Sequence, residues 1–188
     1  MPPKTKISEA MIIDAGFRLV REEGIGALNV RSVSSKLNCS TQPVMHHFAT
    51  VDLLKQAIYR RADAYHTEYL LSHDVGVDDP MLAIGMRYIR FAAEEKHLFC
   101  FLFQSDQFVN ESLTALLQGD AILPMLRILQ EEAALSEEES REVFGSLFIA
   151  AHGFASLFAN NAMQYNEADC ARSLEAIFMG LIRTIKEE

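Results

Sequence analysis

Residues 29–54 read NVRSVSSKLNCSTQPVMHHFATVDLL, a stretch that two short helices separated by a turn would explain. Asn29 and Ser40 are suited to open these helices, because a short polar side chain at an N-cap accepts a hydrogen bond from a free backbone N–H. Asn38 and Cys39 lie between the helices, and asparagine tolerates the left-handed conformation common at helix ends. The stretch therefore predicts a helix-turn-helix, a unit that places its second helix in the major groove of DNA.

The second predicted helix, over residues 40–47, contains a proline. With Ser40 as the N-cap, Pro43 is the third helical residue. Backbone N–H groups in the first turn have no acceptor within the helix, so a proline there removes no helical hydrogen bond. We expect Pro43 to constrain the start of the helix, and we expect Ser40 to cap Gln42.

The residues of this segment divide into a packing set and an outward set. The spacing predicts that the angle between the helices is fixed by Val33, Leu37, Cys39, Val44 and Phe48. On the outer side, Gln42 can donate to and accept from a base edge, and the Thr41 hydroxyl can reach a base or a phosphate. Met45 can contact a thymine methyl, His47 can donate to a phosphate, and Lys36 adds attraction that does not depend on sequence. The candidate DNA-binding residues are Lys4, Lys6, Arg31, Ser40, Thr41, Gln42, Pro43, Met45, His46 and His47.

The rest of the chain also favours helices, since apolar residues recur at helical spacing and no strand-like alternation is present. Further helix starts are predicted at Ser8, Thr50, Pro80, the Ser136–Glu139 capping box and Asn166. We expect an all-α protein of about nine helices, with a DNA-binding domain over residues 1–50 and a helical domain over residues 51–188.

The order of features over residues 7–60 resembles the TetR/AcrR family of transcriptional regulators. An amphipathic first helix leads into the turn REEGIGALNV (residues 21–30), then come RSVSSKLNCS (31–40), a recognition segment ending in His-Phe and a long fourth helix. STQPVMHHF (40–48) is similar to a branch of the family in which STQP opens the recognition helix. The resemblance implies that Arg31 lies near the phosphates and that the DNA-facing helix carries Thr41, Gln42, Pro43, Met45, His46 and His47.

The chain departs from this pattern at three positions. Asn38 and Cys39 stand where the family commonly has Gly and Val, and Val51 stands where a lysine often contacts phosphate. The last difference removes one expected anchor, so it concerns the affinity for DNA and leaves the expected fold unchanged.

Two later segments, YIRFAAEEKHLFCFLF (88–103) and FGSLFIAAHGFASLFANN (144–161), resemble TetR-type regulatory domains with a His-Gly pair in mid-helix. The resemblance implies a homodimer formed through the last two long helices, which supplies two recognition helices to a palindromic operator. The expected interface residues are Phe144, Ala151, Ala155, Phe158, Leu174, Phe178 and Leu181.

A small-molecule pocket needs an apolar lining with a few polar groups. The candidate lining residues are Phe91, Phe99, Phe103, Met125, Phe148 and His152. For each of these residues alone, a role in the core is the commoner outcome. The family resemblance implies a repressor that a small apolar ligand releases from DNA by changing the separation of the recognition helices.

The net charge of −9 is unevenly divided along the chain. Residues 1–60 carry eight Lys or Arg and five Asp or Glu, whereas residues 61–188 carry nine and twenty-one. Charges more than about 8–10 Å apart are largely screened at cellular salt. A basic end of the chain can therefore bind phosphate without strong repulsion from the acidic end.

Other functional classes lack their sequence signatures. We find no G-x-S-x-G, phosphate-binding glycine loop or H-E-x-x-H, so we expect no enzyme, metal or cofactor. The N-terminus has no signal-peptide core, the apolar run over residues 143–159 is too short and interrupted for a membrane span, and three scattered cysteines suit a reducing cytoplasm. Two alternatives stay open: a redox sensor using Cys39 or Cys170 on the same scaffold, and a helical ligand-binding protein that does not bind DNA.

Overall fold

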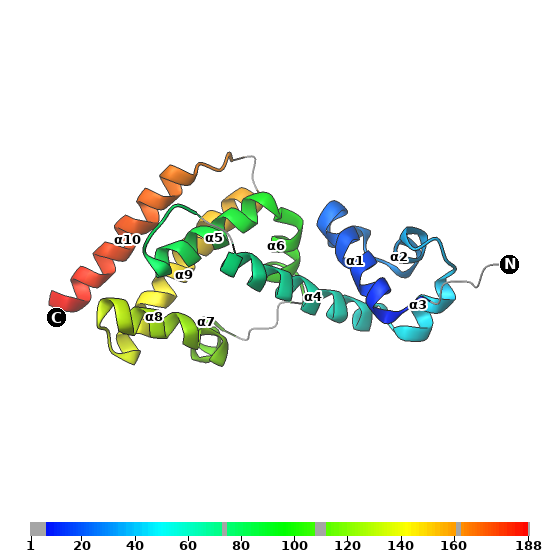
Figure 1. Ribbon diagram of the computed structural model, residues 1–188, viewed down its shortest axis with the longest axis horizontal. Helices are drawn as coiled ribbons and strands as arrows, with labels where there is room; N and C mark the ends of the chain where they lie inside the picture. Colours follow the sequence, from blue (N-terminus) through cyan, green and yellow to red (C-terminus); the bar gives the residue numbers. More distant parts are fainter. Residues whose placement is uncertain (1–6, 73–74, 108–111, 161–162, 188) are drawn as a thin grey trace. The chain divides into compact units, whose positions relative to one another are not determined.

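The computed structural model describes residues 7–72, 75–107, 112–160 and 163–187. Within these ranges the chain forms ten α-helices and two short 3₁₀ helices, without a strand. Figure 1 shows the α-helices along the chain. The helices are α1 (Glu9–Glu23), η1 (Ile25–Ala27), α2 (Val30–Lys36), α3 (Thr41–His47), α4 (Val51–Ser72), α5 (Pro80–Glu94), α6 (Lys96–Phe103), α7 (Leu113–Gln118), η2 (Asp120–Ile122), α8 (Leu123–Ala133), α9 (Glu137–Asn160) and α10 (Glu167–Glu187). The all-α prediction is confirmed, with one α-helix more than expected.

Short polar side chains open several helices where the sequence predicted it. The N–H of Met11 donates to the Ser8 hydroxyl at 3.3 Å, and the N–H of Leu53 donates to the Thr50 hydroxyl at 3.2 Å. These bonds satisfy N–H groups that have no acceptor inside the helix. Asn166 caps α10 in the same way, accepting from the Asp169 N–H at 3.1 Å.

The capping box before α9 is also present. The N–H of Ser136 donates to the Glu139 carboxylate at 2.6 Å, and the N–H of Glu139 donates to the Ser136 hydroxyl at 3.3 Å. Hydrogen bonding to the Ser136 side chain, followed by the bond from the Ser136 N–H, lowers the pKa of the Glu139 carboxyl, because these donors favour its charged form.

The described residues form two compact units. The first contains α1, η1, α2, α3, α6 and α4 up to Glu68, and the second contains the end of α4, α5, α7, η2, α8, α9 and α10. The first unit is thus larger than the domain expected over residues 1–50, since it includes most of α4 and the distant helix α6.

The core of the first unit is built on the apolar face of α1. Ile12, Phe17 and Val20 are buried there, and Ile13 is half-buried. Gly16 lets α4 approach closely, because a Cβ at this position would lie 2.2 Å from Cδ1 of Ile58.

The core of the second unit lies between α5 and α9, with α8 and α10 packed against them. Among the described residues, α9 is the one helix with the length and composition to cross a membrane, a test that core helices of soluble proteins also pass. Its buried side chains include Val143, Phe144, Ala151 and Ala155, which fits the expected helix of a bundle.

Candidate nucleic-acid interface

The α3 helix presents one buried face and one exposed face. Val44 is fully buried and Phe48, at the C-cap, is 7% exposed. Thr41, Gln42 and His46 are exposed, and Met45 is 45% exposed. Helix α3 therefore offers polar donors and acceptors on the side that its core contacts leave open.

The start of α3 differs from the expectation in one detail. Ser40 occupies the N-cap with extended backbone, and Pro43 is the third helical residue, as predicted. The Ser40 side chain, however, makes no capping hydrogen bond. Proline removes the N–H of the third position, one of the two donors that an N-cap side chain normally accepts from, and the hydroxyl does not take the other at Gln42.

The turn between α2 and α3 is closed by backbone hydrogen bonds. Asn38 adopts the left-handed conformation with φ of 51°, as expected of an asparagine at a helix end. The N–H of Cys39 donates to the Ser34 carbonyl at 3.0 Å, and the Cys39 side chain is half-buried. The α2–α3 pair therefore has the tight turn of a helix-turn-helix.

His47 has a different contact from the one predicted. Its Nε2 lies 3.2 Å from the carbonyl oxygen of Ile7, and the ring is half-buried. A carbonyl oxygen accepts but cannot donate, so Nε2 carries the proton and is already used. In this structure His47 ties Ile7, the residue before the N-cap of α1, to the end of α3 and does not offer that N–H to a phosphate.

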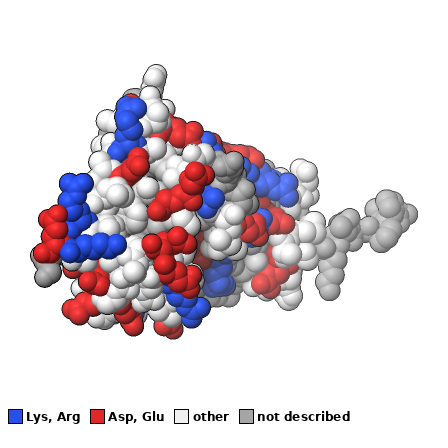
Figure 2. Space-filling model, turned by 60° about the vertical axis from the view of Figure 1, so that its left-hand side comes forward, with Lys and Arg blue, Asp and Glu red and all other residues white. Residues whose placement is uncertain are grey.

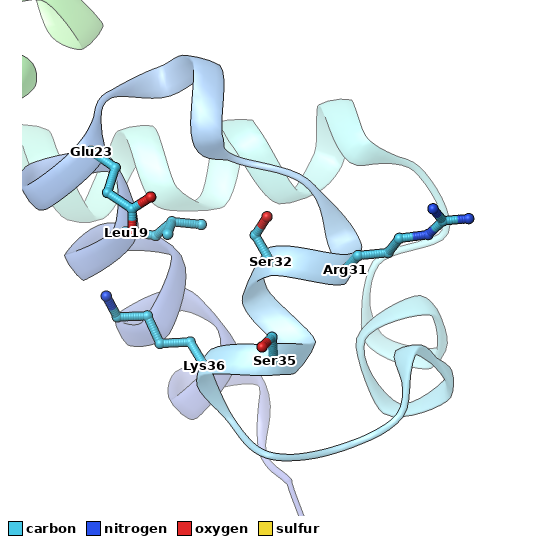
Figure 3. A pocket seen from close by; sticks show the side chains of 6 residues that line it. All are labelled: Leu19, Glu23, Arg31, Ser32, Ser35 and Lys36. Carbon is cyan, nitrogen blue, oxygen red and sulfur yellow. The ribbon is translucent and has the colours of Figure 1, made fainter.

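The basic residues of the first unit differ in their availability. Arg31 is exposed, and Figure 3 shows its side chain extending away from the other five residues around an open hollow of about 500 Å³. Lys36 forms an ion pair with Glu22, which competes with a role at phosphate. Lys4 and Lys6 lie outside the described residues.

The hollow shown in Figure 3 is lined by Leu19, Glu23, Arg31, Ser32, Ser35 and Lys36. It contains none of the expected effector-binding residues. Its lining carries two basic side chains, Arg31 and Lys36, and one acidic side chain, Glu23.

The expected effector residues are divided between the two units. Phe99 and Phe103 belong to the first unit, where their ring centroids lie 5.2 Å apart. Phe91, Met125, Phe148 and His152 belong to the second unit, and of these Phe91 is fully buried.

An aromatic cluster in the second unit contains two of these residues and one that the sequence did not single out. The Tyr88 hydroxyl lies 2.9 Å from Nδ1 of His152, and the Phe148 ring lies 5.6 Å from the His152 ring. Burial raises the pKa of Tyr88 and lowers the pKa of His152, so the hydroxyl donates to a neutral imidazole. Tyr88 is one of the buried residues of α5, but its polar partner is 64 residues away, and sequence spacing gave no sign of this contact.

A second hollow, of about 200 Å³, lies in the second unit and has a mostly apolar wall. It is lined by Asp79, Met81, Ile128, Leu129, Glu132, Ala133, Phe178, Met179, Ile182 and Lys186. None of the six candidate effector residues is part of it.

The residues expected at the dimer interface lie on α9 and α10, but most of them face the interior of one chain. Phe144, Ala151, Ala155, Phe158, Leu174 and Phe178 are at most 9% exposed, and Leu181 is half-buried. Large exposed apolar side chains on the same helices are Ile149 and Leu157 of α9 and Ile177 and Met179 of α10. A second copy that packs on these helices would therefore contact these four exposed side chains before it reached the buried ones.

The cysteines and possible metal ligands were also located. Burial raises the pKa of the Cys100 thiol and of the Cys170 thiol, which makes the reactive thiolate scarcer. Within the described ranges, no three His, Cys, Asp or Glu side chains are grouped as a metal site.

Figure 2 shows one face of the molecule, on which acidic and basic side chains are interspersed. On this face neither sign of charge forms one large patch.

Comparison with known proteins agrees with this geometry. Residues 81–181, more than half of the chain, match the model of the family "Tetracyclin repressor-like, C-terminal domain". The chain is 21% identical over 176 residues to the uncharacterized HTH-type transcriptional regulator YobS of Bacillus subtilis (strain 168), covering 93% of this chain and 90% of the relative.

Solved structures share the fold. A member of the TetR family from Streptomyces coelicolor A3 is 20% identical, with a TM-score of 0.57 over 89% of this chain and 96% of that one. The multidrug binding protein EbrR, complexed with ethidium, is 19% identical, with a TM-score of 0.58 over 94% of this chain and 99% of that one. With more than half of its length matched by the family model, the chain belongs to the tetracyclin repressor-like (TetR) family of transcriptional regulators.

Proposed function

We propose that this regulator binds a palindromic operator through α3 and is released from it by a small, largely apolar molecule. The observation that supports DNA binding most directly is the exposed face of α3. Thr41, Gln42, Met45 and His46 are exposed on a helix whose other side is anchored by the buried Val44. A helix with these properties can enter the major groove without disturbing the core.

Within this proposal the outward residues have separate roles. Gln42 reads a base edge, Thr41 contacts a base or a phosphate, and Met45 contacts a thymine methyl. Arg31, extended from the start of α2, binds a phosphate. We assign the chain to the branch of the family that shares the STQP opening of α3, on the resemblance of residues 40–43.

Two copies are needed to read a palindrome. We assign the interface to the outer faces of α9 and α10, where Ile149, Leu157, Ile177 and Met179 are exposed. A Cβ at Gly153 or Gly180 would meet no atom within 4 Å, so both helices have bare backbone available for close approach by a second copy.

We place the effector near the Tyr88–His152 pair in the second unit. Phe148 and Phe144 stack beside it, with ring centroids 6.3 Å apart, so one polar pair stands among aromatic rings. EbrR, which shares the fold, has been solved in complexes with ethidium and with malachite green, which are cationic dyes with several aromatic rings. Aromatic surfaces with few polar groups suit such ligands.

The DNA-binding proposal can be tested without knowing the operator. Purified full-length protein is used to select duplexes from a random library at low salt, and the enriched sequences are compared. We expect two inverted half-sites with centres one helical turn, roughly 34–36 Å, apart. Failure to enrich any sequence would contradict specific DNA binding and would favour a helical ligand-binding protein.

The effector site is tested on DNA-free protein, because ethidium also binds DNA. Titration of the protein with ethidium, followed by fluorescence, is expected to show saturable binding that His152→Ala weakens. As a control, His46→Ala, on α3, should leave dye binding unchanged. Equal affinities of the wild type and His152→Ala for ethidium would show that the dye binds away from the Tyr88–His152 pair.

A further inference from the structure

Helix α7 is a short surface helix of the second unit, which also contains the Tyr88–His152 pair (Figure 1). Its six residues all lie in the part of the chain that the structure describes, and none of their side chains is buried. Leu113, the first of them, is 44% exposed. Segments with few buried apolar contacts open more readily than the core of a domain. Helix α7 can therefore leave the surface while the rest of the unit stays folded.

The end of α7 is held against α9 by a close apolar contact. A Cβ at Gly145 of α9 would lie 2.8 Å from Cδ1 of Leu117, the penultimate residue of α7. The leucine side chain thus occupies the space that the glycine leaves empty, and Gly145 is buried while Leu117 is half-buried. A larger side chain at position 145 would push Leu117 away, so this contact depends on the glycine.

A hydrogen bond from α9 holds the same residue of α7. Nη1 of Arg141 donates to the carbonyl oxygen of Leu117. Carbonyls in the last turn of a helix have no donor inside the helix, and a positive charge there also complements the helix dipole. Glu137 orients the guanidinium, since its Oε1 accepts from Nη2 at 2.7 Å and from Nε at 3.2 Å. Because the Arg141 side chain is 27% exposed, its bond to α7 can break without leaving a buried charge unpaired.

The contacts of α7 and the aromatic cluster lie on one row of α9. Four residues at spacings of four, three and four share this face of the helix: Arg141, Gly145, Phe148 and His152. Helix α7 contacts the first two, and the Tyr88 hydroxyl is bonded to the last at 2.9 Å. Phe148 lies between these contacts and is half-buried. It follows Gly145 by about 4.5 Å along the helix axis, so α7 borders the aromatic rings.

We infer that α7 is a lid that opens before an effector reaches the Tyr88–His152 pair, and that Arg141 and Leu117 form the latch that holds it closed. This inference rests on the effector site proposed above. The latch contacts α7 and α9 but not the effector, and α7 closes in the same way over an empty and an occupied site. Breaking the latch therefore raises the rates of association and dissociation by the same factor and leaves the dissociation constant nearly unchanged.

The test measures how fast the full-length, DNA-free protein binds and releases ethidium, by stopped-flow fluorescence. Arg141→Met keeps a long side chain but removes every donor. We expect both rate constants to rise about fivefold, the factor for one net hydrogen bond of typical strength, while Kd changes by less than about twofold. Hydrogen exchange over residues 113–118 should become faster in this variant. Exchange over residues 80–94 should stay as in the wild type, because α5 remains packed.

A second variant breaks the latch without changing any charge. Leu117→Ala empties the space above Gly145 and should also raise both rate constants, which keeps the inference testable if Arg141→Met does not fold. Because it is neutral, it also separates lid opening from a stronger attraction of the cationic dye. Arg172→Met is the matched control, since it breaks an exposed ion pair with Asp169 on α10 of the same unit. Its rates should equal those of the wild type.

The outcomes separate this inference from the proposed effector site. If the wild type shows no saturable binding of ethidium, or if His152→Ala does not weaken it, the effector site fails and the lid fails with it. If ethidium binds at the pair but Arg141→Met and Leu117→Ala keep the wild-type rates, the lid is overturned while the site stands. A raised Kd with an unchanged association rate, or unchanged exchange over residues 113–118, would overturn it as well.

Discussion

At the scale of single residues, Gln42 and His47 lie on the same seven-residue helix with opposite tasks. Gln42 is exposed, so its side chain is available to DNA, whereas His47 is half-buried and hydrogen-bonded to the Ile7 carbonyl. The proposed specificity for DNA and the anchoring of Ile7 should therefore be separable by mutation.

Gln42→Ala is expected to weaken binding to the selected duplex by about 1–3 kcal/mol while changing the affinity for random DNA little, because a base contact is lost and phosphate contacts stay. Fluorescence anisotropy with both duplexes measures the two affinities. Gln164→Ala, an exposed glutamine of the second unit, serves as the control. Equally weakened binding to both duplexes would indicate that Gln42 contacts a phosphate and not a base.

His47→Ala is expected to weaken binding to all duplexes alike, since the histidine holds the residue that follows Lys4 and Lys6 in the chain. If both lysines then lose their phosphates, the slope of log K against log salt becomes shallower by up to about 2, at roughly 0.9 per phosphate. Titrations at several salt concentrations give this slope. His47→Gln, whose amide can donate to the Ile7 carbonyl, should restore much of the wild-type salt slope. An unchanged slope in His47→Ala would exclude this positioning role.

At the scale of helices, features that depend on neighbouring residues could be predicted from the sequence, whereas features that depend on distant contacts could not. Ser8, Asn29, Thr50, Ser136 and Asn166 act as caps where expected, because capping depends on residues three positions away at most. The break between α5 and α6 has no glycine or proline to announce it. It occurs at Glu95, whose carboxylate is held by residues 30 and 74 positions away.

The candidate site shows the same division. The exposed face of α3 follows from helical spacing within eight residues, so Thr41, Gln42, Met45 and His46 could be identified from the sequence. The contact of His47 with Ile7 spans 40 positions, and that of Tyr88 with His152 spans 64. Neither pair leaves a periodic signal, so neither could be predicted.

The close packing of α1 on α4 gives a prediction about Gly16. Gly16→Ala places a methyl 2.2 Å from Cδ1 of Ile58, and overpacking of this kind costs about 1–3 kcal/mol, partly offset by up to about 1 kcal/mol of helix propensity. Urea unfolding measures the loss. Gly26→Ala, outside an α-helix with no atom within 4 Å of the added Cβ, is the comparison and should change stability less.

Within α4, His66 makes the first unit sensitive to acid. Its ring is 8% exposed and packs edge-on against Phe103 at 5.2 Å, and burial lowers the pKa of His66 to about 4. The unfolded chain, with a pKa near 6.5, binds this proton more readily, so stability is full above about pH 6.5 and falls as the pH drops toward 4. The loss is about 3 kcal/mol at one pKa unit equal to 1.36 kcal/mol.

His66→Phe, which keeps an aromatic ring beside Phe103, should flatten this part of the curve of unfolding free energy against pH. His46→Phe, with an exposed histidine, should keep the wild-type curve. If His66→Phe lost as much stability between pH 6.5 and 4 as the wild type, the acid sensitivity would have to come from other groups.

At the scale of the whole molecule, the acidic balance of residues 61–188 and the basic balance of residues 1–60 match the division of labour proposed for the two ends. A single recognition helix contacts too few bases to select one site in a genome, whereas two helices on a two-fold axis read twice as many. The proposed interface on α9 and α10 would thus be as necessary for specificity as the proposed recognition helix α3.

Charge placed on the exposed face of α9 should separate dimerisation from folding. Ile149 and Leu157 are 56% and 40% exposed in the single chain, so Ile149→Asp with Leu157→Asp should leave the chain folded. If two copies meet there, four buried carboxylates would oppose one another, and burial of unpaired charge is strongly unfavourable. We expect a monomer by sedimentation, with affinity for the palindrome reduced to that for a single half-site. Leu71→Asp, at an α4 residue that is 77% exposed, should stay dimeric, and a dimer in the α9 variant would place the two-fold axis on another face.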